Sequence, residues 1–325
     1  LPAEPAKRQH LAVPSLLLSI VVMASLTWLL TEVGGGLSMR LLGLAAIATA
    51  SVLGFIAAES RARHPMLPPL LLKNSTFAVA NLTQGLVFFS SGGLVFMFSL
   101  FLQQVQGHSA AGTGLRFLPM NAAIVGASLL SGWLAAKFGG RFSIIVGLAV
   151  AGLAALGLSQ LGAETAYAKI AIGLILSGFG GGLTIAPLTA IAMNAVESAH
   201  EGIASALLNV GIQIGGIVGI ALQGAIFSRR LAASLGRSLV ELGLPADARD
   251  RLVTRAAQHV TQLPENFPYD ISQTSFNLAI DNAFVSGLQT ALFVASLTLL
   301  SGSLLMAKTL AKSKPISPVM GSTNA

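Results

Sequence analysis

The chain has 325 residues, of which 54% are hydrophobic and only 10% are charged. Soluble domains carry about 25% charged residues, so this composition argues against a cytosolic globular enzyme, and its high apolar content excludes a disordered chain. The formal net charge is +7, and cysteine is absent, which excludes a disulfide framework and a thiolate metal site.

Apolar runs long enough to cross a bilayer recur along the chain. A membrane-spanning helix needs about 20 apolar residues. Eight runs qualify, at 11–31, 41–58, 76–102, 117–136, 142–161, 170–196, 202–228 and 283–307. No Asp, Glu, Lys, Arg or His lies inside any of these predicted spans. The sequence therefore predicts an all-α, polytopic membrane protein with eight transmembrane helices.

The segments between the spans divide the chain into regions. Residues 1–58 form a short start and two spans, and residues 59–75, with Pro65, Pro68 and Pro69, read as a cytoplasmic linker. Residues 76–308 form a six-helix bundle, followed by a tail at 309–325. Within the bundle, about 229–282 is too polar to span and is predicted as an extracytoplasmic loop, with an amphipathic helix possible at 237–262. The first residue is Leu, and we expect a piece of a longer protein.

The basic residues of the short loops predict the orientation, because Lys and Arg accumulate on the cytoplasmic side. One set of loops holds Lys7, Arg8, Arg61, Arg63, Lys73, Lys137, Arg141, Lys308, Lys312 and Lys314. The alternate loops hold only Arg40, Arg116 and Lys169. We therefore expect both termini in the cytoplasm and the protein in the inner (plasma) membrane. The positive charge then reflects membrane topology, and no nucleic-acid partner is expected.

Uncharged polar side chains align along faces of several predicted spans. Residues three or four apart share a helix face, and an unbonded amide in hydrocarbon is costly. Each stripe should therefore face another helix, as interhelical hydrogen-bonding groups, or a wet substrate cavity. The whole set favours a cavity, with Phe96 and Phe98 adding to its apolar wall. The cavity candidates are Asn81, Gln84, Phe88, Ser91, Asn121, Asn209 and Gln213.

Glycine clusters have two interpretations here. Gly211, Gly215 and Gly219 form a ladder of small residues four apart, which favours close helix packing. Gly92–Gly93 and the cluster at 178–182 lie centrally in the first helix of two sets of three spans. Such interrupted helices in corresponding positions indicate the substrate path of a transporter. The cluster at 178–182 lacks the preceding strand of a dinucleotide-binding loop.

No enzyme or cofactor chemistry is expected. His200–Glu201 lacks the second histidine of a zinc-binding helix, and every histidine lies outside the predicted spans. An intramembrane ionisable residue is the usual mark of a proton relay, and the predicted spans contain none. The sequence thus predicts no metal site, no catalytic residue and no cofactor.

The stretch GWLAAKFGGR at 132–141 resembles the signature loop of the major facilitator superfamily. It keeps Gly132, Lys137, Gly139 and Arg141, but Ala136 replaces the acidic residue. The stretches at 101–119 and 186–227 resemble the fourteen-helix drug–proton antiporter branch, the EmrB/QacA type. This resemblance implies a partial major facilitator fold: two central extra helices and the C-terminal six-helix bundle, with the N-terminal six-helix half missing.

The resemblance implies secondary efflux of small hydrophobic or amphipathic drugs by proton antiport and alternating access, without a cofactor. The proton-coupling acids would lie in the missing half. Two alternatives remain open: a facilitator that exports a defined metabolite such as a siderophore, sugar or peptide, and a non-transporting membrane scaffold.

Overall fold

The secondary structure of the described chain is helical. The computed structural model describes residues 20–22, 24–25, 28, 43–44, 46–51, 53–54, 57, 74–257, 269 and 271–309. From residue 74 on, its α-helices are α4 (Ser75–Leu100), α5 (Ala110–Arg116), α6 (Leu118–Phe138), α7 (Gly140–Leu158), α8 (Tyr167–Asn194), α9 (Glu201–Glu241), α10 (Ala246–Ala257) and α11 (Gln273–Thr309). A π-helical turn, η2 (Phe101–Val105), follows α4, and a 3₁₀ turn, η3 (Ser198–His200), precedes α9. These residues contain no strand, which confirms the all-α fold class.

Six helical segments of the described chain are long and apolar enough to cross a membrane. They cover Ser75–Val105, Ala110–Phe138, Gly140–Leu158, Tyr167–Asn194, Glu201–Glu241 and Gln273–Lys308. These segments match the last six predicted spans. The structure describes only separated helical residues of the predicted spans at 11–31 and 41–58, and only the last two residues of the linker at 59–75, so a total of eight helices stays a prediction.

The region predicted as an extracytoplasmic loop, 229–282, is largely helical where it is described, and its side of the membrane stays a prediction. α9 continues to Glu241, α10 follows, and α11 already begins at Gln273. Leu231, Leu235 and Leu239 recur every four residues and form one buried stripe on α9. The charged residues between them raise the average polarity of the segment and hide this stripe from a count of apolar residues.

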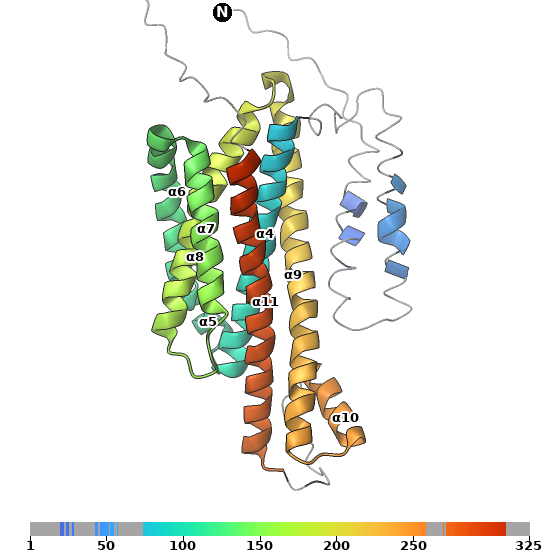
Figure 1. Ribbon diagram of the computed structural model, residues 1–325. Helices are drawn as coiled ribbons and strands as arrows, with labels where there is room; N and C mark the ends of the chain where they lie inside the picture. Colours follow the sequence, from blue (N-terminus) through green and yellow to red (C-terminus); the bar gives the residue numbers. More distant parts are fainter. Residues whose placement is uncertain are drawn as a thin grey trace, which may run out of the picture.

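The last turns of α9 (from about residue 229), α10 and the first turns of α11 form one packed unit, which we call the helical extension (Figure 1). The buried leucines of α9 share one hydrophobic core with Leu252 of α10 and Phe276 of α11. The single amphipathic helix predicted at 237–262 is interrupted, because the chain turns at Gly243, whose φ is +78°, before α10 begins. The early start of α11 also places Asp281 in a helix that is long and apolar enough to cross a membrane.

The six long helices pack as two spatial groups of three. One group contains α6, α7 and α8, and the other contains α4, α9 and α11; α7 against α11 and α4 against α8 join the groups. α8 therefore packs mainly with the helices that follow α4 in the chain, and α4 packs mainly with those that follow α8. This reciprocal exchange is the pattern of two interlocked three-helix repeats.

α6 and α9 lie at the periphery of the bundle. Only 22% of the 18-residue apolar stretch in each of these two segments is buried, against 50% in the segments that contain α4, α7 and α8. α8 and α9 contact each other only slightly. α4 is therefore flanked by two helices, α8 and α9, that barely contact each other.

Candidate functional site

The polar stripe of α4 begins between two neighbouring helices. The Asn81 Nδ2 atom donates to the Leu207 carbonyl oxygen of α9 at 3.4 Å. Gln84 is 2% exposed, and its Nε2 atom lies 3.5 Å from Thr189 Oγ1 of α8. The side-chain oxygens of both amides, Asn81 Oδ1 and Gln84 Oε1, are buried without a hydrogen-bond partner. This end of the stripe thus connects α4 to α9 and to α8.

The stripe becomes more open further along α4. Phe88 is half-buried and Ser91 is exposed. Phe96 is also partly exposed, whereas Phe98 is wholly buried and packs edge-on against Phe101, with ring centroids 6.0 Å apart. Phe98 is therefore a core residue, which corrects its assignment to a cavity wall.

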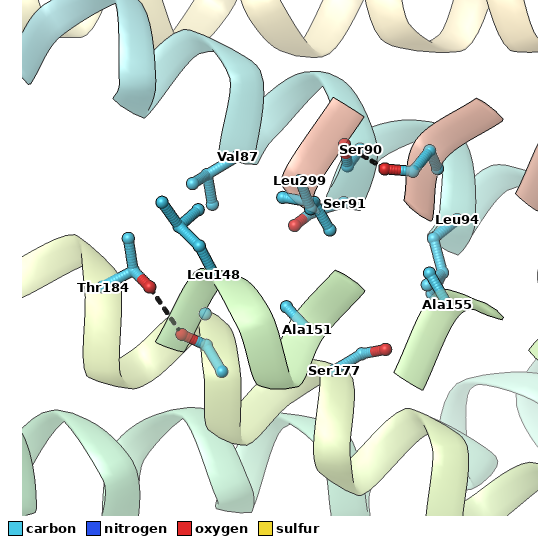
Figure 2. Close-up of a pocket in the computed structure, with 13 residues that line it drawn as sticks. Val87, Ser90, Ser91, Leu94, Leu148, Ala151, Ala155, Ser177, Thr184 and Leu299 are labelled. Carbon is cyan, nitrogen blue, oxygen red and sulfur yellow. Dashed lines mark hydrogen bonds between the residues drawn. The ribbon is translucent and has the colours of Figure 1, made fainter. Parts of the chain in front are cut away.

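Ser91 lines a small cavity where four helices meet (Figure 2). The cavity has a volume of about 20 Å³. Its walls come from α4 (Val87, Ser90, Ser91, Leu94), α7 (Leu148, Ala151, Ala155), α8 (Ser177, Gly180, Gly181, Thr184) and α11 (Ala295, Leu299). It therefore lies at the junction between the two helix groups.

The α4 and α8 walls of this cavity have the same spacing. α4 contributes positions 87, 90, 91 and 94, and α8 contributes positions 177, 180, 181 and 184. Both sets follow the i, i+3, i+4, i+7 pattern of a single helix face. The two first helices of the repeats thus present equivalent faces to one cavity. This matched spacing is the sequence signal that would have found Ser90, Ser177 and Thr184, which the sequence analysis missed.

The candidates on α6 and α9 are exposed rather than gathered around this cavity. Asn121 of α6 donates to the Phe117 carbonyl oxygen at 3.0 Å, and Asn209 of α9 donates to the Ser205 carbonyl oxygen at 3.0 Å. Both bonds stay within their own helix, and Gln213 is exposed as well. The structure therefore separates the seven predicted residues into an α4 group and exposed positions on the two peripheral helices.

The glycine ladder of α9 lies against α4. A methyl group added at Gly215 would lie 2.2 Å from the Gly85 carbonyl oxygen, and one at Gly219 would lie 2.1 Å from the Phe89 carbonyl oxygen. At Gly211 it would lie 2.1 Å from Asn81 Oδ1. At Gly215 and Gly219 the close atoms are backbone, so no side chain fits there and the two helix backbones approach as closely as glycine permits.

The glycines of α8 also mediate close packing. A methyl group at Gly178 or Gly182 would lie 2.3 Å from a backbone carbonyl oxygen of α6, and one at Gly180 would lie 2.4 Å from the Gly147 carbonyl oxygen of α7. A methyl group added at Gly181, by contrast, would meet no atom within 4 Å. Most of this cluster therefore fixes helix approach, and only Gly180 and Gly181 line the cavity.

The signature loop joins α6 to α7 with a single residue between the helices. Gly139 has φ +86° and ψ 146°, a conformation that side chains rarely adopt. The Lys137 Nζ atom lies 5.0 Å from the ring centre of Trp133, within the range of a cation–π contact. Arg141 donates to the Ala307 carbonyl oxygen near the end of α11. At Gly132, by contrast, an added methyl group would meet no atom within 4 Å.

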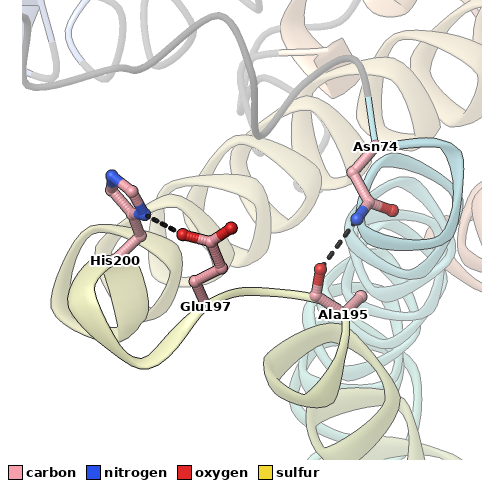
Figure 3. A network of polar contacts seen from close by, with 4 residues as sticks. All are labelled: Asn74, Ala195, Glu197 and His200. Atoms are coloured by element: carbon pink, nitrogen blue, oxygen red, sulfur yellow. Dashed lines mark hydrogen bonds and ion pairs between the residues drawn. The ribbon is translucent and has the colours of Figure 1, made fainter.

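A second connection lies where α4 begins (Figure 3). Asn74 Oδ1 accepts from the Thr76 and Phe77 backbone N–H groups and so caps α4. Its Nδ2 atom donates to the Ala195 carbonyl oxygen at 2.7 Å, just after the end of α8. In the same loop, His200 Nδ1 lies 4.0 Å from Glu197 Oε2. Asn74 therefore ties together the two helices that share the cavity.

The chemistry available at the cavity is hydrogen bonding by neutral groups. The lining residues carry hydroxyls and apolar side chains, and none of them is charged. Among the described residues, no group of three or more His, Cys, Asp or Glu could hold a metal ion. Such a surface suits uncharged or weakly polar ligands, or water.

Comparisons with known proteins agree with this membrane architecture. The sequence model of the Major Facilitator Superfamily matches residues 57–220. The multidrug resistance protein Stp of Mycobacterium tuberculosis is 29% identical over 250 residues, which is 75% of this chain and 46% of Stp. The methylenomycin A resistance protein of Bacillus subtilis is 33% identical over 226 residues, 68% of this chain and 48% of that protein. The chain spans about half the length of these curated relatives.

A solved structure shares the fold. A bacterial homologue of the human lysosomal transporter Spinster, in an inward-facing and occupied conformation, superposes with a TM-score of 0.54 at 18% sequence identity. The alignment covers 92% of this chain and 70% of that chain.

Proposed function

Because this chain belongs to the major facilitator superfamily, we propose that it forms part of a secondary transporter that exports hydrophobic or amphipathic drugs. The family consists of transporters rather than enzymes, and the chain is a multi-pass membrane protein. The names of the relatives from M. tuberculosis and B. subtilis support drug export. Proton antiport, alternating access and a second, N-terminal six-helix half belong to the same proposal.

The observation that carries the proposal is the open side of α4. Phe88 is half-buried and Ser91 is exposed, and we take the side of α4 that carries them as its open side. An apolar surface with a few uncharged hydrogen-bonding groups is the composition of a ligand pocket with loose specificity. In the proposal, this side forms one wall of the substrate cavity, and the N-terminal half forms the other.

Enlarging Ser91 tests this wall. Ser91→Phe in the complete protein is expected to lower the efflux of bulky drugs more than that of small ones, because it narrows the cavity. Ser301→Phe is the matched control, since Ser301 is an exposed serine of α11 that does not line the cavity. Equal efflux by both variants at matched expression would show that Ser91 does not line the substrate path.

The exposed amides of α9 need a separate test. Asn209→Ala and Gln213→Ala are expected to change the relative efflux of several drugs if α9 also lines the cavity. Unchanged efflux across the panel would remove both residues from the proposed site. Inverted vesicles with an imposed pH gradient distinguish drug–proton antiport, which requires the gradient, from facilitated export of a metabolite.

A further inference from the structure

The small cavity between α4, α7, α8 and α11 contains a hydroxyl group with no partner. Ser177 Oγ is buried and makes no hydrogen bond with the protein. Ser90 donates to the Ala295 carbonyl oxygen, but over a long distance of 3.4 Å. Thr184 donates to the Gly180 carbonyl oxygen at 2.8 Å, which leaves its oxygen free to accept. The walls of the cavity thus offer both donors and acceptors.

The volume of the cavity matches one small molecule. About 20 Å³ is available, and one water requires roughly 10–15 Å³ on this measure together with two to four polar partners. Cavities that stay dry are lined by apolar groups, whereas this one has hydroxyls on both α4 and α8. The neutral lining favours water over a metal cation, because cation sites of this kind normally include carboxylates.

We propose that this cavity is a water-binding site that bridges the two helix groups. The water accepts from Ser177 of α8 and donates to a serine hydroxyl oxygen of α4. It replaces direct contact at the point where α4 and α8 present equivalent faces to each other (Figure 2). Buried waters that complete such hydrogen bonds are part of the folded structure. The site shares Ser91 with the proposed substrate wall, but Ser177 and Gly181, which test it, are not part of that wall.

Removing the Ser177 hydroxyl gives opposite results for a hydrated and a dry cavity. If water is bound, Ser177→Ala removes one of its hydrogen bonds and lowers the unfolding midpoint of the purified chain in detergent by about 2–4 °C. If the cavity is dry, the same change removes an unsatisfied polar group and leaves the midpoint unchanged or higher.

Ser296→Ala is the matched control for this measurement. Ser296 is also wholly buried with an unpartnered hydroxyl, but it does not line the cavity. The proposal predicts a lower midpoint for Ser177→Ala and no decrease for Ser296→Ala. Equal shifts of the two variants, or a higher midpoint for Ser177→Ala, would overturn it.

A second pair of variants tests the cavity by filling it. Gly181 lines the cavity and Gly126 of α6 does not, and at both positions an added methyl group meets no atom within 4 Å. Both Gly→Ala changes gain the helix preference of alanine. With water bound, Gly181→Ala crowds it and raises the midpoint less than Gly126→Ala does. A larger increase for Gly181→Ala would mean that an empty space had been filled, and would contradict the proposal.

Discussion

Gly139 shows how one residue shapes the connection between two spans. Its backbone N–H donates to the Ala135 carbonyl oxygen at 2.9 Å, and its φ of +86° turns the chain directly into α7. The motif alone identifies Gly132 and Gly139 as equivalent glycines. Only the backbone geometry distinguishes the two glycines. Gly132 lies inside α6, where an added methyl group would meet no atom within 4 Å.

This difference predicts opposite effects of alanine in one motif. Gly139→Ala should destabilise the chain by about 1–3 kcal/mol, because alanine strains this backbone conformation. Gly132→Ala should be neutral or stabilising by up to about 1 kcal/mol. Unfolding midpoints in detergent compare the two variants. A stable Gly139→Ala protein would show that the loop can adopt another conformation.

The polar residues illustrate what sequence could and could not identify at this scale. Helical periodicity grouped Asn81, Gln84, Phe88 and Ser91 on one face of a helix, and α4 is helical over these residues. Periodicity could not show that the first two contact α9 and α8 while Ser91 stays open, because this depends on neighbours distant in the sequence. Ser177 was missed because the polar stripe of α4 was not compared with the positions of equal spacing on α8.

The contact between α4 and α9 depends on glycine at the level of the helix pair. Gly215→Ala should push the two helices apart and destabilise the chain by about 1–3 kcal/mol, as overpacking does. Gly224→Ala, on the same helix, adds a methyl group with no atom within 4 Å and should not destabilise. Thermal stability and monodispersity in detergent provide the measurement. Similar behaviour of the two variants would contradict the close approach of α4 and α9.

The helical extension contains more helix than the sequence analysis expected. A helix of 41 residues such as α9 is about 60 Å long, twice the thickness of the hydrocarbon core. Average polarity suggested a loop, whereas the four-residue repeat of Leu231, Leu235 and Leu239 specifies a packed helix. Periodicity was therefore the more informative property of this segment.

Protease sensitivity tests the packing of the extension. Leu235 is 0% exposed, so Leu235→Ala should lose about 2–5 kcal/mol of local packing and make the arginines of α9 and α10 susceptible to trypsin. Leu278→Ala is the control, since Leu278 is 57% exposed. Rapid cleavage of the wild-type extension would contradict a packed structure. Cleavage of Leu235→Ala in intact spheroplasts would support the predicted extracytoplasmic side.

For the whole molecule, composition and run length were sufficient to predict an all-α membrane protein, and the signature loop was sufficient to indicate its superfamily. The spatial grouping of the helices was not predictable in the same way. α4 and α8 exchange partners between the sequential sets, and helix order alone carries no information about such an exchange. The cavity arises from this exchange, so it too required the structure.

The most direct test of the central proposal uses the absence of cysteine from this chain. Ser91→Cys and Leu129→Cys are introduced singly, because Ser91 lies on the open side of α4 and Leu129 is 78% exposed on the peripheral helix α6. If α4 lines a drug-transporting cavity, a water-soluble maleimide should label the Ser91→Cys variant of the complete protein in the membrane. Bound drug should slow this labelling. The Leu129→Cys variant should stay unlabelled, because position 129 faces lipid. No labelling at position 91, or labelling that drug does not affect, would contradict a substrate cavity lined by α4.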